Sequence, residues 1–336
     1  MIKIDSKNTT RKDHITIDFF YEQTKNRFNL KLFTKDQDCN KVIVDQNLHR
    51  PGLALAGFVD LFSYNRIQVI GNTEMGYLKI LSKDQRKKSF ERLFKFDIPC
   101  IVITNNHEPF PEMIELADKY KITIFGSNYS TTKIVYLISD FLEDQFAPRL
   151  SLHGSFVDVY GVGILFVGKS GIGKSEVALD LVERGHRIVA DDVVIFTKKG
   201  EGILMGSGTK LVEHFMEVRG IGIIDIRSMF GVRAIRYQKR LELVVELEVW
   251  DDNTEYTRTG LDSKTISLMD IDIPYVKLPI VPGKNVTVIS EVIALNYLLR
   301  HYGYDAAKKL QEKLLNSMKN HSRNDRHVDY FEHDFE

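Results

Sequence analysis

The sequence contains little cysteine and no excess of charge of either sign. Its two cysteines, Cys39 and Cys100, are far apart in 336 residues and lack the spacing of a metal or redox site. A disulfide framework is therefore excluded, and reduced thiols are expected. Basic and acidic residues number 46 each, so the formal net charge is zero. A protein that binds nucleic acid through its backbone needs a basic surplus, so no nucleic-acid partner is predicted.

The sequence also lacks any apolar run long enough to span a bilayer, and its first residues do not resemble a signal peptide. These absences predict a cytoplasmic protein with no membrane partner. Hydrophobic residues make up 43% and charged residues 27%, which is typical of a soluble globular chain. A chain of 336 residues is too long for one ordinary core, and two domains are expected.

The first half alternates strand and helix patterns, which predicts an α/β domain with a parallel sheet over residues 1–145. Residues 147–154 are expected to form the seam between the domains, and residues 146–336 are assigned to the second domain. The tail after about residue 320 is expected to be frayed. The expected elements of the first domain are strands at 15–20, 65–71, 98–106 and 121–127, and helices at 82–94, 109–120 and 131–146.

Two elements of the second half carry clear periodicity. Residues 240–250 alternate leucine or valine with glutamate, which predicts a strand that is buried on one face and exposed on the other. Residues 290–303 have a helical pattern, with Ser290 as the expected N-cap and Gly303 as the expected end.

The strongest chemical signal is the stretch GKSGIGKS. It fits the phosphate-binding pattern G-x-x-x-x-G-K-[ST], with a strand expected before it and a helix after it. Glycines let the backbone curl so that its N–H groups face phosphate oxygens, the lysine adds a cation, and the serine hydroxyl can ligate Mg²⁺. The residues of this loop are Gly168, Lys169, Ser170, Gly171, Ile172, Gly173, Lys174 and Ser175. A nucleotide site is predicted here.

Two adjacent acids, Asp191 and Asp192, follow after one short helix. A carboxylate near the γ-phosphate can hold Mg²⁺ or accept the proton of an attacking hydroxyl. Neighbouring residues of a strand point to opposite faces, so only one of them should reach the site unless the strand ends there. A turn in which both acids are merely solvated is the alternative.

Other candidates are weaker when taken singly. Glu217 and Arg219 lie just before a Gly-x-Gly segment and could be a metal ligand and a phosphate clamp, or part of a tight turn. His153, Arg258 and Lys284 occur in patterns that are equally consistent with surface positions.

Taken in order, HRPGLALAGFVDLF, RIQVIGNTE, His153, GKSGIGKS, RIVADD, MEVRGIGIID, YTRTGLD and PIVPGKN resemble the bacterial HPr kinase/phosphorylase family along nearly the whole chain. The resemblance implies a catalytic domain similar to phosphoenolpyruvate carboxykinase and a homohexamer. It also implies a bifunctional enzyme. With ATP and Mg²⁺ such enzymes phosphorylate a serine of HPr, the small phosphocarrier of the sugar phosphotransferase system. With inorganic phosphate they remove the phosphoryl group and release pyrophosphate.

By position, the resemblance implies the following roles. Lys174 contacts the β/γ-phosphates, Ser175 and Glu217 are associated with Mg²⁺, and Asp192 exchanges the serine proton. His153 and Arg258 are further catalytic residues. The supporting residues are Asp191, Arg219, Pro279, Pro282, Gly283 and Lys284.

Two departures from the family pattern lie in the segment linked to dephosphorylation. This chain has Val281 where the family usually has a basic residue, and Lys284 where the family usually has arginine. A weaker phosphate site and a slower phosphorolytic direction are expected. A small-molecule kinase built on the same loop and a nucleotide-sensing regulator without catalysis are the alternative functions.

Overall fold

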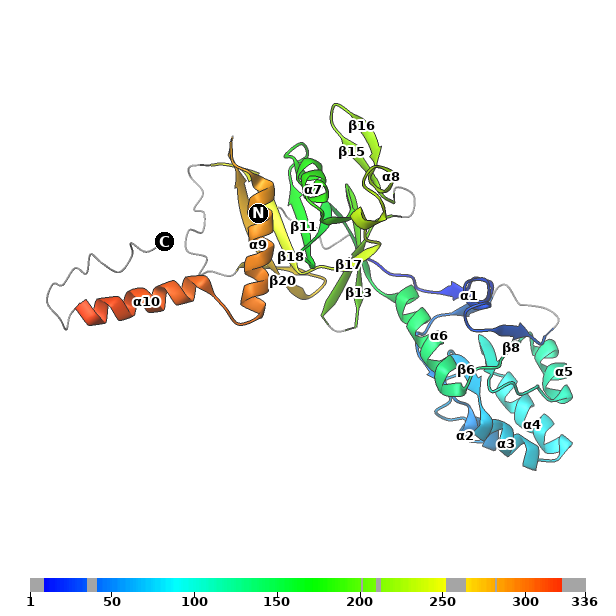
Figure 1. Cartoon of the computed structure of the whole chain (residues 1–336). Helices are drawn as coiled ribbons and strands as arrows, with labels where there is room; N and C mark the ends of the chain where they lie inside the picture. Colours follow the sequence, from blue (N-terminus) through cyan, green and yellow to red (C-terminus); the bar gives the residue numbers. More distant parts are fainter. Residues whose placement is uncertain are drawn as a thin grey trace. The chain divides into compact units, whose positions relative to one another are not determined.

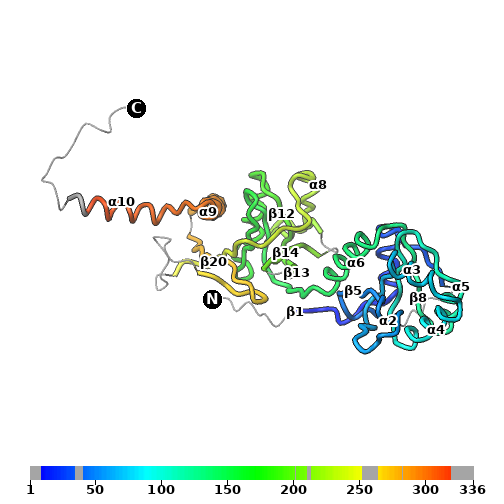
Figure 2. Tube along the Cα trace, turned by 90° about the horizontal axis from the view of Figure 1, so that it is seen from below, coloured from blue at the N-terminus to red at the C-terminus, as the bar shows by residue number. Residues whose placement is uncertain are grey.

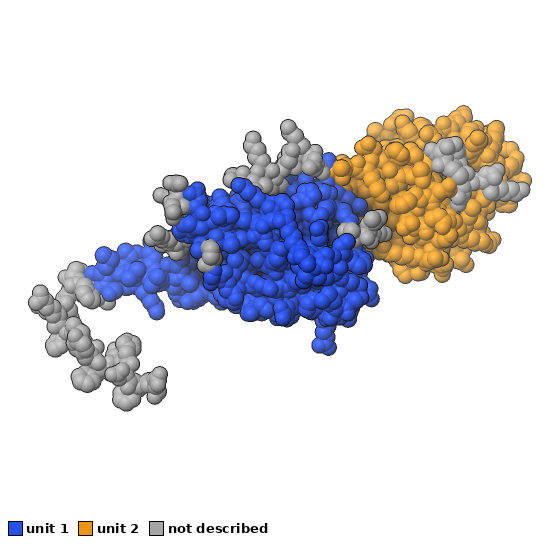
Figure 3. All heavy atoms as spheres, turned by 90° about the horizontal axis from the view of Figure 1, so that it is seen from above, with its two compact units in different colours: residues 1–9, 149–336 blue, residues 10–148 orange. Residues whose placement is uncertain are grey.

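The computed structural model describes residues 9–34, 41–200, 202–209, 213–251, 264–281 and 283–321. The chain forms two compact units (Figure 3). The N-terminal unit comprises Thr10–Pro148, and the C-terminal unit comprises Met1–Thr9 together with Arg149–Glu336. Within the described ranges, no helix is long and apolar enough to cross a membrane.

The N-terminal unit is built on a five-stranded sheet in the order β3-β8-β7-β6-β5. Strands β5 to β8 are parallel, which confirms the predicted α/β class, but β3 pairs antiparallel with β8, so the sheet is not wholly parallel as expected. The strands are β3 (Leu30–Leu32), β5 (Leu48–His49), β6 (Ile67–Ile70), β7 (Cys100–Ile103) and β8 (Thr123–Ser127), with a separate pair β2 (Ile15–Thr16) and β4 (Val42–Ile43).

Among the described residues of this unit, the helices that accompany the sheet are α1 (Ile17–Thr24), α2 (Gly52–Ala56), α3 (Asn72–Ile80), α4 (Lys83–Phe94), α5 (Pro111–Tyr120) and α6 (Thr131–Phe146) (Figures 1 and 2). The ends of α4 and α5 follow local rules, since Ser82 caps α4 by accepting from the Gln85 backbone N–H, and Pro111 opens α5. The expected strand at 15–20 is wrong beyond Thr16, because Thr16 accepts from the Phe19 N–H and caps α1 instead.

The C-terminal unit contains two larger sheets that share a core. The six-stranded sheet has the order β12-β10-β11-β18-β20-β19, and the five-stranded sheet has the order β1-β9-β13-β14-β17. Buried residues of both sheets form one cluster that includes Leu152, Phe156, Val167, Val194 and Val244. The strands of the six-stranded sheet are β10 (Ser155–Val159), β11 (Val162–Gly168), β12 (Arg187–Ala190), β18 (Leu243–Val249), β19 (Lys264–Leu268) and β20 (Ile271–Ile280).

The other sheet contains β1 (Thr9–Thr10), β9 (Arg149–His153), β13 (Val193–Lys199), β14 (Ile203–Ser207) and β17 (Gln238–Arg240). A separate hairpin of β15 (Phe215–Val218) and β16 (Gly222–Asp225) leads to α8 (Ile226–Phe230) and the 3₁₀ turn Val232–Ala234. The helices α7 (Lys174–Glu183) and α9 (Val286–His301) contribute to a second core against β11 and β18, and α10 (Ala306–His321) follows α9 (Figure 2).

The prediction of a half-exposed strand at 240–250 is wrong. β18 pairs in parallel with β11 on one side and with β20 on the other, and both of its faces are covered. Glu246 is consequently only 4% exposed. A central parallel strand is buried whatever its polar pattern, because each face packs against another layer.

The expected N-cap at Ser290 for the helix at 290–303 is also wrong. α9 begins four residues earlier, with Asn285 accepting from the Val288 N–H as its N-cap. Ser290 is fully buried inside the helix, and its hydroxyl donates to the Val286 carbonyl. Both residue types cap helices, so the sequence allowed either start.

An ion-pair cluster joins the parallel helices α7 and α9 and consists of Arg184, His186 and Glu291. Arg184 donates to both carboxylate oxygens of Glu291, at 2.9 and 2.6 Å, and His186 Nε2 lies 3.0 Å from Glu291 Oε1. One turn earlier, Thr287 donates to Asp180 at 3.1 Å. These contacts fix α9 against the helix that begins at the phosphate loop.

Candidate phosphate-transfer site

The predicted phosphate loop links β11 to α7. Gly168 ends the strand, and a Cβ there would lie 2.7 Å from the backbone carbonyl oxygen of Leu247. Gly173 is the N-cap of α7 and has a φ of 102°, in the left-handed region that favours glycine. The two glycines of the motif are therefore required by a close backbone approach and by the turn into the helix. The loop places the positive end of α7 at the site.

Lys174 and Ser175 open α7 directly after this turn. The Lys174 ammonium donates to the carbonyl oxygens of Gly168 at 3.3 Å and Lys169 at 3.2 Å, so it lies over the curl of the loop. The Ser175 hydroxyl donates to the carboxylate of Asp191, at 2.9 Å from Oδ2 and 3.2 Å from Oδ1. The motif lysine and serine thus lie over the loop and beside Asp191, where the phosphate-loop pattern predicts phosphate and metal contacts.

Asp191 is held in a buried, polar environment. It is 8% exposed, and it accepts from the hydroxyls of Ser155 at 2.5 Å and of Ser175. Burial raises the pKa of Asp191, while the two hydroxyls and a backbone N–H act in the opposite direction. The alternative in which both acids are merely solvated is therefore wrong for Asp191.

Asp192 has the opposite character. Its side chain is 82% exposed, and its Oδ1 lies 3.6 Å from Nδ1 of His153, which is similarly exposed. The residue has a φ of 65°, a left-handed conformation that aspartate tolerates better than most residues. Its carbonyl accepts from the Gly154 N–H at 3.1 Å, which ties the turn to the end of β9.

Both carboxylates reach the site because the strand ends before them. β12 stops at Ala190 and β13 starts at Val193, so Asp191 and Asp192 form the connection between two sheets. The alternation of strand side chains does not apply in this turn. The expectation that only one acid reaches the site applied unless the strand ended there, and the strand does end there.

The β15–β16 hairpin supplies a further acid and cation. Met216 and Val218 are buried on one face of β15, while Glu217 is exposed on the other. Arg219 follows in the turn, and its Nη2 donates to the Ser170 hydroxyl at 3.4 Å. Glu217 and Arg219 are therefore more than parts of a tight turn, because they face the phosphate loop.

These elements enclose a cavity of about 140 Å³. Its lining residues are Ser170, Gly171, Gly173, Lys174, Ser175, Glu176, Asp191, Asp192, Glu217 and Arg219. Across the described ranges, no group of three or more His, Cys, Asp or Glu side chains is arranged to hold a metal ion. One hydroxyl and one or two carboxylates beside a phosphate site do fit Mg²⁺, which takes its other ligands from phosphates and water.

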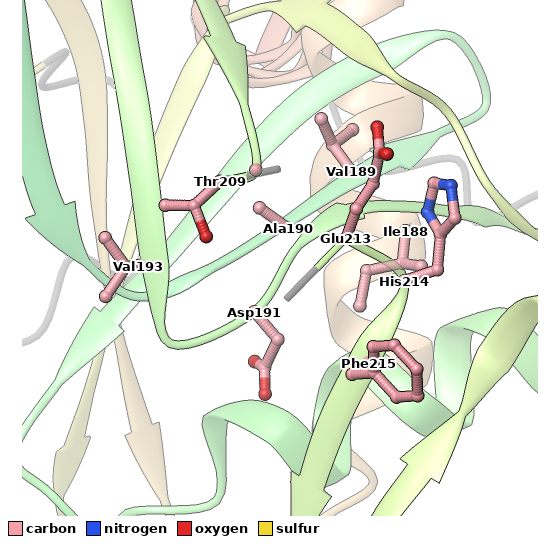
Figure 4. Close-up of a pocket in the computed structure, with 10 residues that line it drawn as sticks. Ile188, Val189, Ala190, Asp191, Val193, Thr209, Glu213, His214 and Phe215 are labelled. Carbon is pink, nitrogen blue, oxygen red and sulfur yellow. The ribbon is translucent and has the colours of Figure 1, made fainter. Parts of the chain in front are cut away.

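A neighbouring cavity is too small to hold a ligand. It measures about 10 Å³, room for one water molecule, and it lies among β12, Thr209 and residues 213–215 (Figure 4). Figure 4 shows the carboxylate of Asp191 pointing away from the side chains of Ala190 and Glu213. Asp191 also lines the larger cavity described above.

Two protein-family models together match most of the chain. The model of the HPr Serine kinase C-terminal domain matches residues 144–314, and the model of the HPr Serine kinase N terminus matches residues 15–142. An HPr kinase/phosphorylase of Chloroherpeton thalassium is 51% identical and covers 98% of this chain and 99% of its own length. One from Prosthecochloris aestuarii is 48% identical, over 96% and 95%. The chain belongs to the HPr kinase/phosphorylase family.

A solved structure of the HPr(Ser) kinase/phosphatase from Coxiella burnetii is 31% identical to this family member, with a TM-score of 0.43. The match covers 48% of this chain and 98% of the Coxiella burnetii chain. The family identification confirms the predicted enzyme class and the two-domain, mixed α/β architecture.

Some predicted residues of this family member lie apart from the cavity. Pro279 is in β20, and Gly283 and Lys284 precede α9, but none of them lines the cavity. Arg258 and Pro282 lie outside the described residues. Sequence reasoning missed Glu176 and Ser155. Glu176 directly follows the motif, which could have identified it, whereas no motif marks Ser155.

Proposed function

We propose that this chain phosphorylates a serine of the phosphocarrier protein HPr with ATP and reverses the reaction with inorganic phosphate, releasing pyrophosphate. The observation that carries the proposal is the convergence of the phosphate loop, the Asp191–Asp192 turn and Glu217 with Arg219 on one cavity. Family membership supplies the identity of the protein substrate. In keeping with the family resemblance, the proposal includes a homohexamer.

The residues present fit ATP with Mg²⁺. The curled backbone of residues 168–173, the helix end and Lys174 would hold the phosphates. Ser175 and Glu217 would hold the metal ion, which when bound neutralises charge on the transferred phosphoryl group. Arg219, already in contact with Ser170, would contribute a second cation from the hairpin.

The proton transfer is assigned to Asp192. In the kinase direction, its carboxylate accepts the proton of the substrate serine hydroxyl as the serine oxygen bonds to the γ-phosphorus and the bond to ADP breaks. In the reverse direction, inorganic phosphate attacks the phosphorus of phosphoserine, the serine O–P bond breaks as pyrophosphate forms, and Asp192 returns the proton to the serine oxygen. Asp192 is exposed at the cavity, and His153 beside it orients the carboxylate.

The proposal is tested by incubating the purified chain with HPr, Mg²⁺ and ATP, and then with phosphate after ATP has been removed. We expect mass spectrometry to show phosphate added to one HPr serine in the first step and lost in the second, with pyrophosphate formed. Labelled phosphate that appears on a metabolite would support a small-molecule kinase. Nucleotide binding without any transfer would support a regulator.

A second prediction concerns the segment before α9. Val281 has no charge, and Lys284 offers a point charge where arginine would offer a planar fork for phosphate. We expect the double variant Val281→Lys with Lys284→Arg to raise the rate of phosphate-dependent dephosphorylation, on the order of tenfold, at about 1.4 kcal/mol. The kinase rate is expected to stay within about twofold, because in that direction the phosphoryl group comes from ATP and no free phosphate has to be held.

The two rates would be measured on the same preparations, with phosphate varied to separate kcat from KM. The gain should appear mainly as a lower KM for phosphate. A phosphorolytic rate in the variant equal to that of the native chain would contradict the prediction.

A further inference from the structure

Ser155 lies behind the phosphate site and has no place in the reaction described above. It is the first residue of β10, pairs with Phe166 of β11, and is fully buried. It does not line the cavity. Its hydroxyl donates to Oδ1 of Asp191 at 2.5 Å. A buried hydroxyl therefore meets the same carboxylate that the motif serine contacts from the other side.

This arrangement leaves Asp191 little freedom. Its Oδ1 accepts from Ser155 at 2.5 Å, while Ser175 donates to Oδ2 at 2.9 Å and more weakly to Oδ1 at 3.2 Å. A serine hydroxyl has one hydrogen to donate and two lone pairs. Because the Ser175 hydrogen points to Asp191, its lone pairs are left for a cation in the cavity.

We propose that Ser155 is a positioning residue for the metal ion: it holds Asp191, and Asp191 in turn holds the Ser175 hydroxyl with its lone pairs toward the nucleotide-bound Mg²⁺. This inference rests on the proposed function, which assigns Ser175 to the metal. Groups that orient a metal ligand from behind typically change metal affinity by about 10–100-fold when they are removed. Without Ser155, Oδ1 loses its shorter hydrogen bond, and the carboxylate is held less firmly.

The test uses the full chain with the variants Ser155→Ala, Ser155→Cys and Ser155→Thr. Cysteine has a size similar to that of serine and donates weakly, so it removes the hydrogen bond while filling the core. Threonine keeps the hydroxyl. Ser290→Ala is the matched control, because Ser290 is also fully buried and donates only within α9.

Mn²⁺ binding in the presence of a non-hydrolysable ATP analogue would be followed by electron paramagnetic resonance, and metal-free binding of a fluorescent ATP analogue would be measured in EDTA. We expect alanine and cysteine to weaken Mn²⁺ binding about tenfold or more, with threonine and the Ser290 control near the native value. Metal-free nucleotide affinity should be unchanged. In the kinase assay, the Mg²⁺ concentration at half-maximal rate should rise while kcat at saturating Mg²⁺ is largely restored.

Unchanged Mn²⁺ affinity in a folded alanine or cysteine variant would overturn the proposal. Equal loss of metal-free nucleotide binding would do so as well, since it would indicate general damage to the site. Because the binding measurements need no HPr, a failure of HPr phosphorylation would count against the proposed function and would leave this test intact.

Discussion

Replacing Asp192 with asparagine is expected to lower kcat for phosphoryl transfer to HPr by roughly 10²–10⁴-fold, the range for loss of a general base. Asparagine keeps the shape of the side chain and tolerates the left-handed φ of 65° at this turn, so the fold should be preserved. The amide cannot accept the serine proton. Stopped-time assays with saturating ATP and HPr would measure kcat.

Nucleotide affinity separates this prediction from a binding defect. The Ser175 hydroxyl donates to Asp191, whereas the Asp192 side chain is exposed, so ATP binding should change by less than about threefold. Asp272→Asn is a suitable control, because Asp272 is exposed on β20 roughly 20 Å along the sheet from the phosphate loop. A variant at position 192 that keeps nearly native kcat would contradict the assignment.

Replacing Glu291 with glutamine is expected to lower the free energy of unfolding of the C-terminal unit by about 3 kcal/mol, the lower end of the range for breaking a buried ion pair. The Glu291 side chain is 9% exposed and serves both Arg184 and His186. The Arg184 side chain is 47% exposed and can be hydrated after the change, which favours the lower value. Denaturant unfolding, followed by hydrogen exchange of α7 and α9, would measure the loss.

The pH dependence of this loss follows from the same contacts. Hydrogen bonding and charge from Arg184, followed by His186, hold the pKa of Glu291 below its ordinary value of 4.5. Because the folded state favours the ionised carboxylate, its contribution is complete above about pH 4.5 and disappears as the pH falls through the lowered pKa. The stability difference between the native chain and Glu291→Gln should therefore shrink in acid.

Glu183→Gln serves as the control, since it removes the same charge from an exposed position at the end of α7. It should change stability by less than about 0.5 kcal/mol. If both variants lost the same stability, the effect would arise from overall charge and not from the ion-pair cluster.

Local chemistry explains what could be predicted. Gly168 and Gly173 were recognised because a phosphate loop needs particular backbone conformations, and the helices expected at 82–94 and 109–120 correspond to α4 and α5. Asp191 and Asp192 were recognised by their spacing from the loop. Which of them is buried was not predictable, because the outcome depends on where β12 ends and on which strand covers it.

Long-range packing decided the remaining features. The alternating pattern of β18 suggested an exposed face, but its place between β11 and β20 buries Glu246. The partners of Glu291 are Arg184 and His186, at and just after the end of α7 and more than 100 residues earlier in the chain. The sequence by itself determined the phosphate loop, the class of chemistry and the bounds of helices such as α4 and α6, since these depend on neighbouring residues. Only the tertiary structure decided that Ser155, Ser175 and Asp191 share one hydrogen-bonded group, because burial and contacts across the sheets arise from residues distant in the chain.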